Sequence, residues 1–213
     1  MNLKISSLFF VQLCILCFLY STADAQIPKA KPNAQLILSE IQDSMASVKE
    51  IKADFEQEKK LSLFKHVIKL KGNLEIKFPH YFRWEITSPL KTVITADGDT
   101  VTTWDEETKE TQTLSVKHNP VVKSIWTQID SWFMGKYDEL SKNYYIELIQ
   151  QDPAILEFKP KSKTIAATVK KITVYFREDK KYLQQVKLEE KGGDSTVIRF
   201  LNIKLNESKN QVQ

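Results

Sequence analysis

The side chains that could carry covalent or metal chemistry are few in this sequence. The histidines are His66, His80 and His118, and none has a second ligand at the spacing that zinc sites use. The cysteines, Cys14 and Cys17, lie in an apolar run near the start of the chain. Nucleophile-elbow, phosphate-loop and zinc-protease motifs are absent. We therefore expect no enzyme activity, no metal and no cofactor.

The first 25 residues predict a secretory signal. Lys4 precedes the apolar run 8–20, and Ala23 and Ala25 occupy the two small-residue positions of a cleavage site. The run is too short for a membrane span. Neither cysteine follows the small residues that a lipid-anchor site needs. The sequence thus predicts an exported, soluble chain that is cleaved after Ala25 and retains no thiol.

The charge is mildly basic and evenly spread. Lys and Arg number 31 against 27 Asp and Glu, for a formal net charge of +4. Lysines scattered along the chain argue against nucleic-acid binding. The length suits one domain with a sizeable core. We expect a flexible leader at 26–33, the domain at 34–205 and a polar tail at 206–213.

The spacing of apolar residues predicts a mainly β fold with two or three helices. Apolar residues recur at helical spacing over 34–48. Residues 70–78 alternate strictly between apolar and polar side chains, as a strand with one buried face does. The Asp97–Gly98 pair predicts a hairpin turn, and further strands follow from residue 144. Short turns between consecutive strands predict one curled antiparallel sheet, with helices plugging its concave side over an apolar cavity.

A second amphipathic helix is expected over 120–134. Asn119 can cap it, Pro120 suits its first position and Gly135 can stop it. We interpret it as a lid over the mouth of the sheet, and the alternative is a helix docked permanently as core. Its apolar face includes Val122, Ile125, Trp126, Ile129 and Phe133.

Aromatic side chains are densest in the stretch FPHYFRWEITSPL at 78–90. On a strand, Phe82, Trp84 and Ile86 share one face, and Arg83 and Glu85 share the other. The apolar set either lines a cavity or fills a closed core. The charged pair is expected on the outer face, where it would cross-link neighbouring strands.

Three blocks, in order, resemble a known family. ADFEQEKKL contains a Phe-x-Gln pattern at Phe55 and Gln57, and KGNLEIKFPHYFRWEITSP carries the aromatic block. ITADGDTVTTWDEETKE supplies the hairpins that follow. Together they resemble the periplasmic outer-membrane lipoprotein carriers, the LolA-like proteins, over roughly residues 34–205.

The resemblance implies a fold and a function. The fold would be an incomplete barrel of eleven antiparallel strands with helices over its mouth. The protein would be a periplasmic monomer that accepts an acylated lipoprotein from an inner-membrane transporter and passes it to an outer-membrane receptor. Alternatives are a carrier of another amphiphile (a glycolipid, fatty acid or pigment ester) and an interaction module with a filled core. The expected cavity lining is Phe55, Leu74, Ile76, Phe82, Trp84 and Ile94.

The sequence departs from the family at Phe78. Members often have Arg directly before the proline that precedes the aromatic block, and that Arg holds the lid shut over the empty cavity. With Phe78 in its place, the empty protein is expected to favour an open lid. The replacement Phe78→Arg should bias the lid closed and weaken the uptake of cargo.

Overall fold

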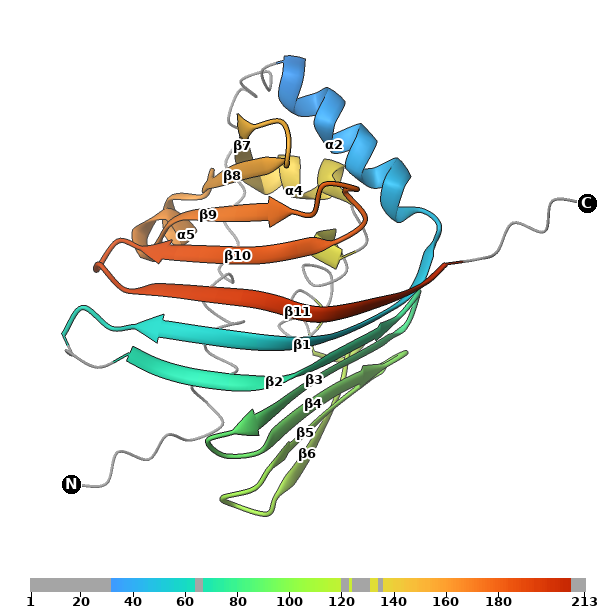
Figure 1. The fold of residues 1–213 in the computed structure, drawn as a ribbon. Coiled ribbons are helices and arrows are strands. Elements are labelled where there is room, and N and C mark those ends of the chain that lie inside the picture. Colours follow the sequence, from blue (N-terminus) through green and yellow to red (C-terminus); the bar gives the residue numbers. More distant parts are fainter. Residues whose placement is uncertain (1–31, 64–66, 120–122, 124–130, 134–135, 208–213) are drawn as a thin grey trace, which may run out of the picture.

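The computed structural model describes residues 32–63, 67–119, 123, 131–133 and 136–207 (Figure 1). The predicted signal and most of the predicted leader, lid helix and tail lie outside these residues. A single eleven-stranded sheet dominates the fold, in the order β6-β5-β4-β3-β2-β1-β11-β10-β9-β8-β7. Its two edge strands do not pair with each other, so the curled sheet stays open.

Every pairing in the sheet is antiparallel, and the strands follow each other along the chain except at the centre. There β1 pairs with β2 on one side and with β11 on the other. The bounds are β1 Val48–Lys60, β2 Val67–Lys77, β3 Tyr81–Ser88, β4 Thr92–Asp97, β5 Thr100–Asp105, β6 Thr111–Ser115, β7 Tyr144–Gln150, β8 Ile155–Pro160, β9 Val169–Phe176, β10 Leu183–Glu190 and β11 Ser195–Glu207.

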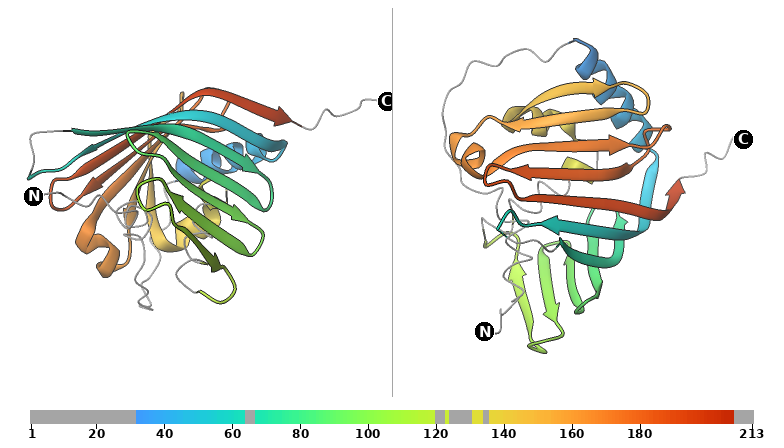
Figure 2. Two further views of the ribbon diagram at one scale, coloured as in Figure 1. Left: turned by 90° about the horizontal axis from the view of Figure 1, so that it is seen from below. Right: turned by 60° about the vertical axis from the view of Figure 1, so that its left-hand side comes forward.

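Helices lie on the concave side of the sheet (Figure 2). Helix α2, Pro32–Met45, buries Ile37, Leu38 and Ile41 at helical spacing, as the sequence predicts. It ends at Met45 rather than at the predicted residue 48, because the chain extends into β1 from Val48.

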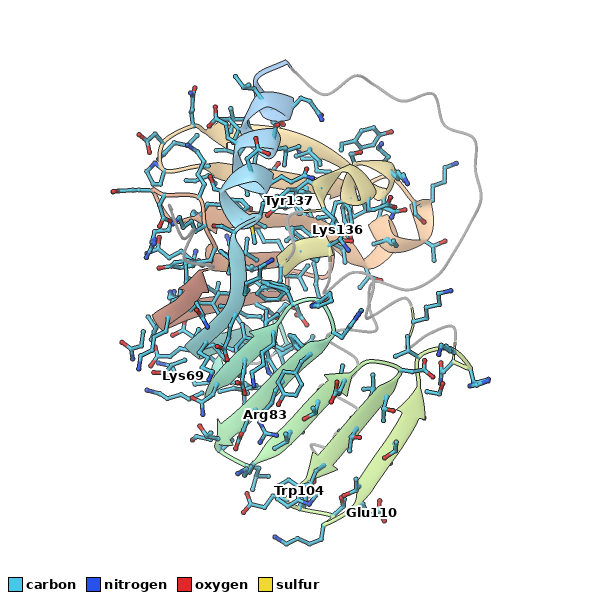
Figure 3. The ribbon with its side chains drawn as sticks, turned by 90° about the vertical axis from the view of Figure 1, so that its right-hand side faces the viewer. Lys69, Arg83, Trp104, Glu110, Lys136 and Tyr137 are labelled. Carbon is cyan, nitrogen blue, oxygen red and sulfur yellow. The ribbon has the colours of Figure 1, made fainter. Side chains whose placement is uncertain are left out.

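Two short helices were not predicted. They are α4, Tyr137–Asn143, and α5, Lys163–Thr168. Neither is long enough to show two full turns of apolar spacing, which is the signal that indicates a helix in a sequence. Burial raises the pKa of the Tyr137 phenol, whose hydroxyl lies 3.9 Å from the Met45 sulfur and so joins α4 to α2 (Figure 3).

The two faces of the sheet differ in chemistry because its side chains alternate. In β2, Gly72, Leu74 and Ile76 are buried, and the residues between them are partly or fully exposed. The outer face carries a mesh of ion pairs between neighbouring strands. Lys71 of β2 lies 2.7 Å from Glu56 of β1, and this contact lowers the pKa of the Glu56 carboxyl. The concave face is therefore apolar and the convex face is charged and well solvated.

Candidate functional site

Aromatic rings gather on the concave face where β1, β3 and β11 lie near one another. The Phe55 and Trp84 rings stack with their centroids 3.9 Å apart. Phe82 lies 6.4 Å from Trp84 in a nearly parallel arrangement, and Phe200 of β11 meets Trp84 edge-on at 6.4 Å. We call Phe55, Phe82, Trp84 and Phe200 the aromatic cluster. Its contacts combine residues that are far apart in the sequence.

The sheet register places all six predicted lining residues on this concave face. Trp84 pairs with Leu74 on one side and with Ile94 on the other, and Phe82 pairs with Ile76. Ile94 is half-buried, and the other five are buried. Phe200 was missed, because only the pairing of β11 with β1 brings it to the cluster.

The space beside the cluster is small in this conformation. A cavity of about 10 Å³ lies next to Met45, Leu74 and Phe200. A cavity measured in this way needs about 10 to 15 Å³ to hold one water molecule, so this one has room for about one water and none for an acyl chain. At this place the described side chains fill most of the space next to the sheet. A chain could enter at this place only if some of those side chains moved.

Part of the predicted lid helix reaches this face. Residues 131–133 are helical, and the Phe133 ring lies 6.4 Å from Phe82 and 5.9 Å from Phe200. Trp132 packs edge-on against Phe158 at 4.7 Å. Phe133 therefore contacts the aromatic cluster from the side opposite the sheet. Val122, Ile125, Trp126 and Ile129 lie outside the described residues.

Phe78, the position that departs from the family pattern, follows the end of β2. Its backbone N–H donates to the carbonyl oxygen of Lys49 at 3.0 Å, and its half-buried ring packs against the core. Its effect on the lid stays a prediction.

The Arg83–Glu85 pair lies on the outer face of β3, as predicted. Arg83 Nη2 binds Glu85 Oε2 at 2.7 Å within the strand, and the links to the neighbouring chain segment come from the other atoms of the pair. Lys91, just before β4, binds the other carboxylate oxygen at 2.7 Å, and Arg83 Nη1 reaches the Thr95 hydroxyl of β4 at 3.5 Å. Hydrogen bonds from Lys91 and then Arg83 lower the pKa of the Glu85 carboxyl. Trp104 of β5 lies on this same face, away from the aromatic cluster (Figure 3).

The described residues carry neither a metal cluster nor a membrane-spanning helix. That part of the chain holds no group of three or more His, Cys, Asp or Glu side chains placed to bind a metal ion. A membrane-spanning helix must be long and apolar, and among the described helices none qualifies.

The open, curled sheet and its aromatic concave face define a half-barrel protein with helices on its inner side. The family model described as "Outer membrane lipoprotein carrier protein LolA" matches residues 46–211. The chain belongs to the LolA family.

Relatives with curated names are distant in sequence. An outer-membrane lipoprotein carrier protein of Chromohalobacter salexigens is 26% identical over 190 residues, which cover 87% of this chain and 80% of the relative. A protein of the same name from Actinobacillus pleuropneumoniae serotype 3 is 28% identical over 130 residues, or 59% of this chain and 55% of the relative.

Solved structures are similar at lower identity. A LolA superfamily protein from Nitrosomonas europaea superposes with a TM-score of 0.41 at 11% identity, covering 82% of this chain and 94% of that one. The lipoprotein LppX from Mycobacterium tuberculosis gives a TM-score of 0.47 at 14% identity, covering 83% and 98%.

Proposed function

We propose that the protein is a non-catalytic periplasmic carrier that shields the acyl chains of a lipoprotein against its aromatic concave face. It would accept this cargo at the inner membrane from a transporter and release it to a receptor at the outer membrane. Membership of the LolA family supports this role. The observation that carries it is the contrast between the apolar concave face and the ion-paired convex face of one open sheet.

The need for such a carrier follows from the free energy of hydrating hydrocarbon. Moving one methylene of an acyl chain out of water is worth about 0.8 kcal/mol, so a long chain is worth on the order of 10 kcal/mol. A multiply acylated protein cannot leave a membrane for water against that free energy. An apolar face that encloses the chains removes most of the cost.

The packing of the aromatic rings against one another also bears on the release of cargo. The rings of Phe55, Phe82 and Trp84 cover one another and are buried, so little of their apolar surface meets water. Binding cargo would exchange these contacts for contacts with the chain, and release would restore them. This exchange keeps affinity moderate, because the cargo must compete with the side chains of the protein itself.

The test introduces a charge into the face. Trp84→Glu should abolish binding of a fluorescent fatty-acyl probe, because an unpaired carboxylate cannot be buried in apolar surroundings. Ile94→Glu should also weaken binding, and this half-buried position on β4 is the less demanding one for folding. Trp104→Glu is the matched control, because Trp104 lies on the convex face. Circular dichroism would establish that each variant is folded.

Full probe affinity in folded Trp84→Glu or Ile94→Glu would refute the role of this face. The native cargo is a separate question, which mass spectrometry of protein purified from the periplasm would answer. A co-purified lipoprotein supports the proposal as stated. A glycolipid, fatty acid or pigment ester would keep the carrier role and change the cargo. N-terminal sequencing should give Gln26 if the signal is cleaved as proposed.

A further inference from the structure

One end of the concave face is polar rather than apolar. Gln57 of β1 and Thr196 of β11 are each only 2% exposed. Gln57 follows Phe55 by two residues, and Thr196 pairs directly with Lys59, two residues further along β1. Since alternate residues of a strand share a face, all of these side chains lie on the same side of the sheet as the aromatic cluster.

A carboxylate adds to this group from the next strand. Leu188 of β10 pairs with Thr196, and Glu190 lies two residues beyond Leu188, after an irregularity in the pairing of β10 with β9, with its carboxyl close enough to Lys59 for the two charges to interact. Glu190 is half-buried, and burial raises the pKa of its carboxyl against the attraction of Lys59. We call Gln57, Lys59, Glu190 and Thr196 the polar end.

Three oxygen atoms of the polar end are buried without a hydrogen-bond partner among the described residues. They are Gln57 Oε1, Glu190 Oε1 and Thr196 Oγ1. Buried polar atoms in folded proteins nearly always have a partner, because an unmade hydrogen bond costs free energy. An amide oxygen can only accept, an ionised carboxylate oxygen can only accept, and a hydroxyl can do either. The missing partner is therefore a hydrogen-bond donor.

The polar end continues directly into the apolar face. Along β1, the residues that point to the concave side run from Lys59 and Gln57 to Phe55, Ala53 and Ile51. Along β11 the corresponding row runs from Thr196 through Ile198 to Phe200. Both rows change from polar to apolar in the same direction, as an amphiphile changes from its head to its chain.

We propose that the polar end binds the head of the carried amphiphile through a hydroxyl or amide N–H adjacent to an acyl group. The acyl chain then lies toward the aromatic cluster, with the head near the β1–β2 and β10–β11 hairpins. This inference rests on the proposed carrier function and adds to it the orientation of the cargo and the chemistry of its head.

Two probes with the same chain separate the head from the chain. Monolauroylglycerol has hydroxyl donors, and methyl laurate has none. Native protein should bind monolauroylglycerol roughly tenfold more tightly, which is the range that one or two net hydrogen bonds supply. Equal affinity for the two probes would overturn the polar end as a head site and leave the carrier function standing. Failure of both probes to bind would refute the carrier function itself.

Two near-isosteric variants then locate the effect. Gln57→Leu and Thr196→Val remove the unpartnered oxygens and should each weaken monolauroylglycerol binding roughly threefold to tenfold, with methyl laurate binding unchanged. Their resistance to urea should stay the same or rise, because a buried oxygen without a partner is lost. Thr92→Val is the matched control: Thr92 is also buried on the concave face, but its hydroxyl lies 3.4 Å from Asp105 Oδ2.

A purely structural role would give another result. If a bound water already satisfies these oxygens, Gln57→Leu and Thr196→Val should lower resistance to urea and leave the preference between the probes intact. That outcome overturns the inference. Should either variant fail to fold, the probe preference of the native protein and of the other variant still decides the question.

Discussion

At Gly72 the backbone of β2 lies against the Phe55 ring and leaves no room for a side chain. A Cβ at this position would lie 1.9 Å from the Glu85 carbonyl oxygen and 2.5 Å from Phe55 Cζ. A methyl group would therefore displace both the backbone of β3 and a ring that is stacked on Trp84. We predict that Gly72→Ala lowers the free energy of unfolding by about 3 kcal/mol, as overpacking of a rigid core does.

Urea unfolding would measure this loss. Gly192→Ala is the control, because a Cβ there meets no atom within 4 Å, and it should change stability by no more than about 0.5 kcal/mol. An unchanged urea midpoint for Gly72→Ala would mean that Phe55 does not rest on the sheet at this point.

Glu157 of β8 holds two lysines on the outer face. Lys171 Nζ lies 2.6 Å and Lys159 Nζ 2.9 Å from its two oxygens. Burial acts to raise the pKa of the Glu157 carboxyl, but the hydrogen bonds from the two lysines outweigh it and the pKa lies below its usual value. A lowered pKa in the folded state stabilises the protein above the unfolded value, near 4.5, and this contribution is lost as the pH falls.

We therefore predict that Glu157→Gln lowers the free energy of unfolding by about 1 to 2 kcal/mol near neutral pH. The difference from the native protein should shrink as the pH is lowered below the usual carboxylate range. Urea titrations across pH would measure both effects, with the exposed Glu107→Gln as control. A difference that is constant across pH would show that the charge of Glu157 has no part in it.

Residues whose faces follow from local alternation could be predicted from the sequence. Leu74, Phe82 and Trp84 belong to strands whose period-two pattern is regular, so their common face was evident. Phe200 and Thr196 could not be assigned in this way, because their position depends on the register between β11 and β1. No local pattern states that register. The polar end could not be predicted for the same reason, although Gln57 belongs to the Phe-x-Gln motif.

At the scale of elements, the helical segment that contains Phe133 is either a lid over the concave face or a fixed part of the core. Phe133 is half-buried and lies beside the small cavity next to the aromatic cluster. If the segment is a lid, Phe133→Ala should reduce the free energy of unfolding by about 1 kcal/mol and change the affinity for an acyl probe. A fully packed phenylalanine would lose about 3 to 5 kcal/mol.

Urea unfolding and probe titration would be made on the same samples. Phe158→Ala serves as the control, because Phe158 is fully buried against Trp132 and Tyr144 and should show the larger loss. A large loss for Phe133→Ala, with unchanged probe affinity, would identify the segment as permanent core.

Elements with regular apolar patterns were predicted well, and the two short helices were not. Helix α2 and strands β2 and β3 appear within a few residues of their predicted bounds. Helices α4 and α5 contain seven and six residues, which is too few for a helical period to emerge. The position of α4 is set by packing, because Tyr137 and Leu140 are buried against the rest of the core, whereas α5 buries no residue.

At the scale of the whole molecule, β1 joins two halves of the sheet. Strands β2 to β6 continue from one side of it, and β11 back to β7 continue from the other. Within the described strands, the β1–β11 pairing is the one hydrogen-bonded connection between the halves. It runs from Val48 opposite Glu207 to Lys60 opposite Ser195.

This central pairing has a consequence for how the chain folds. A ribosome releases the N-terminal half first, and β1 must wait with one edge unpaired until nearly all of the chain has emerged. The chain between β1 and β11 forms a long loop that closes slowly. All-β proteins with such distant contacts fold in about milliseconds to seconds. We predict that a chain ending after Glu190, without β11, gives no cooperative urea transition and aggregates, whereas the full chain refolds. A sharp transition in the shortened chain would mean that β1 to β6 form an independent folding unit. A chain that folds only once β11 is present stays unfolded throughout its synthesis. If the protein is exported as proposed, that is the state in which a membrane translocation channel can thread it.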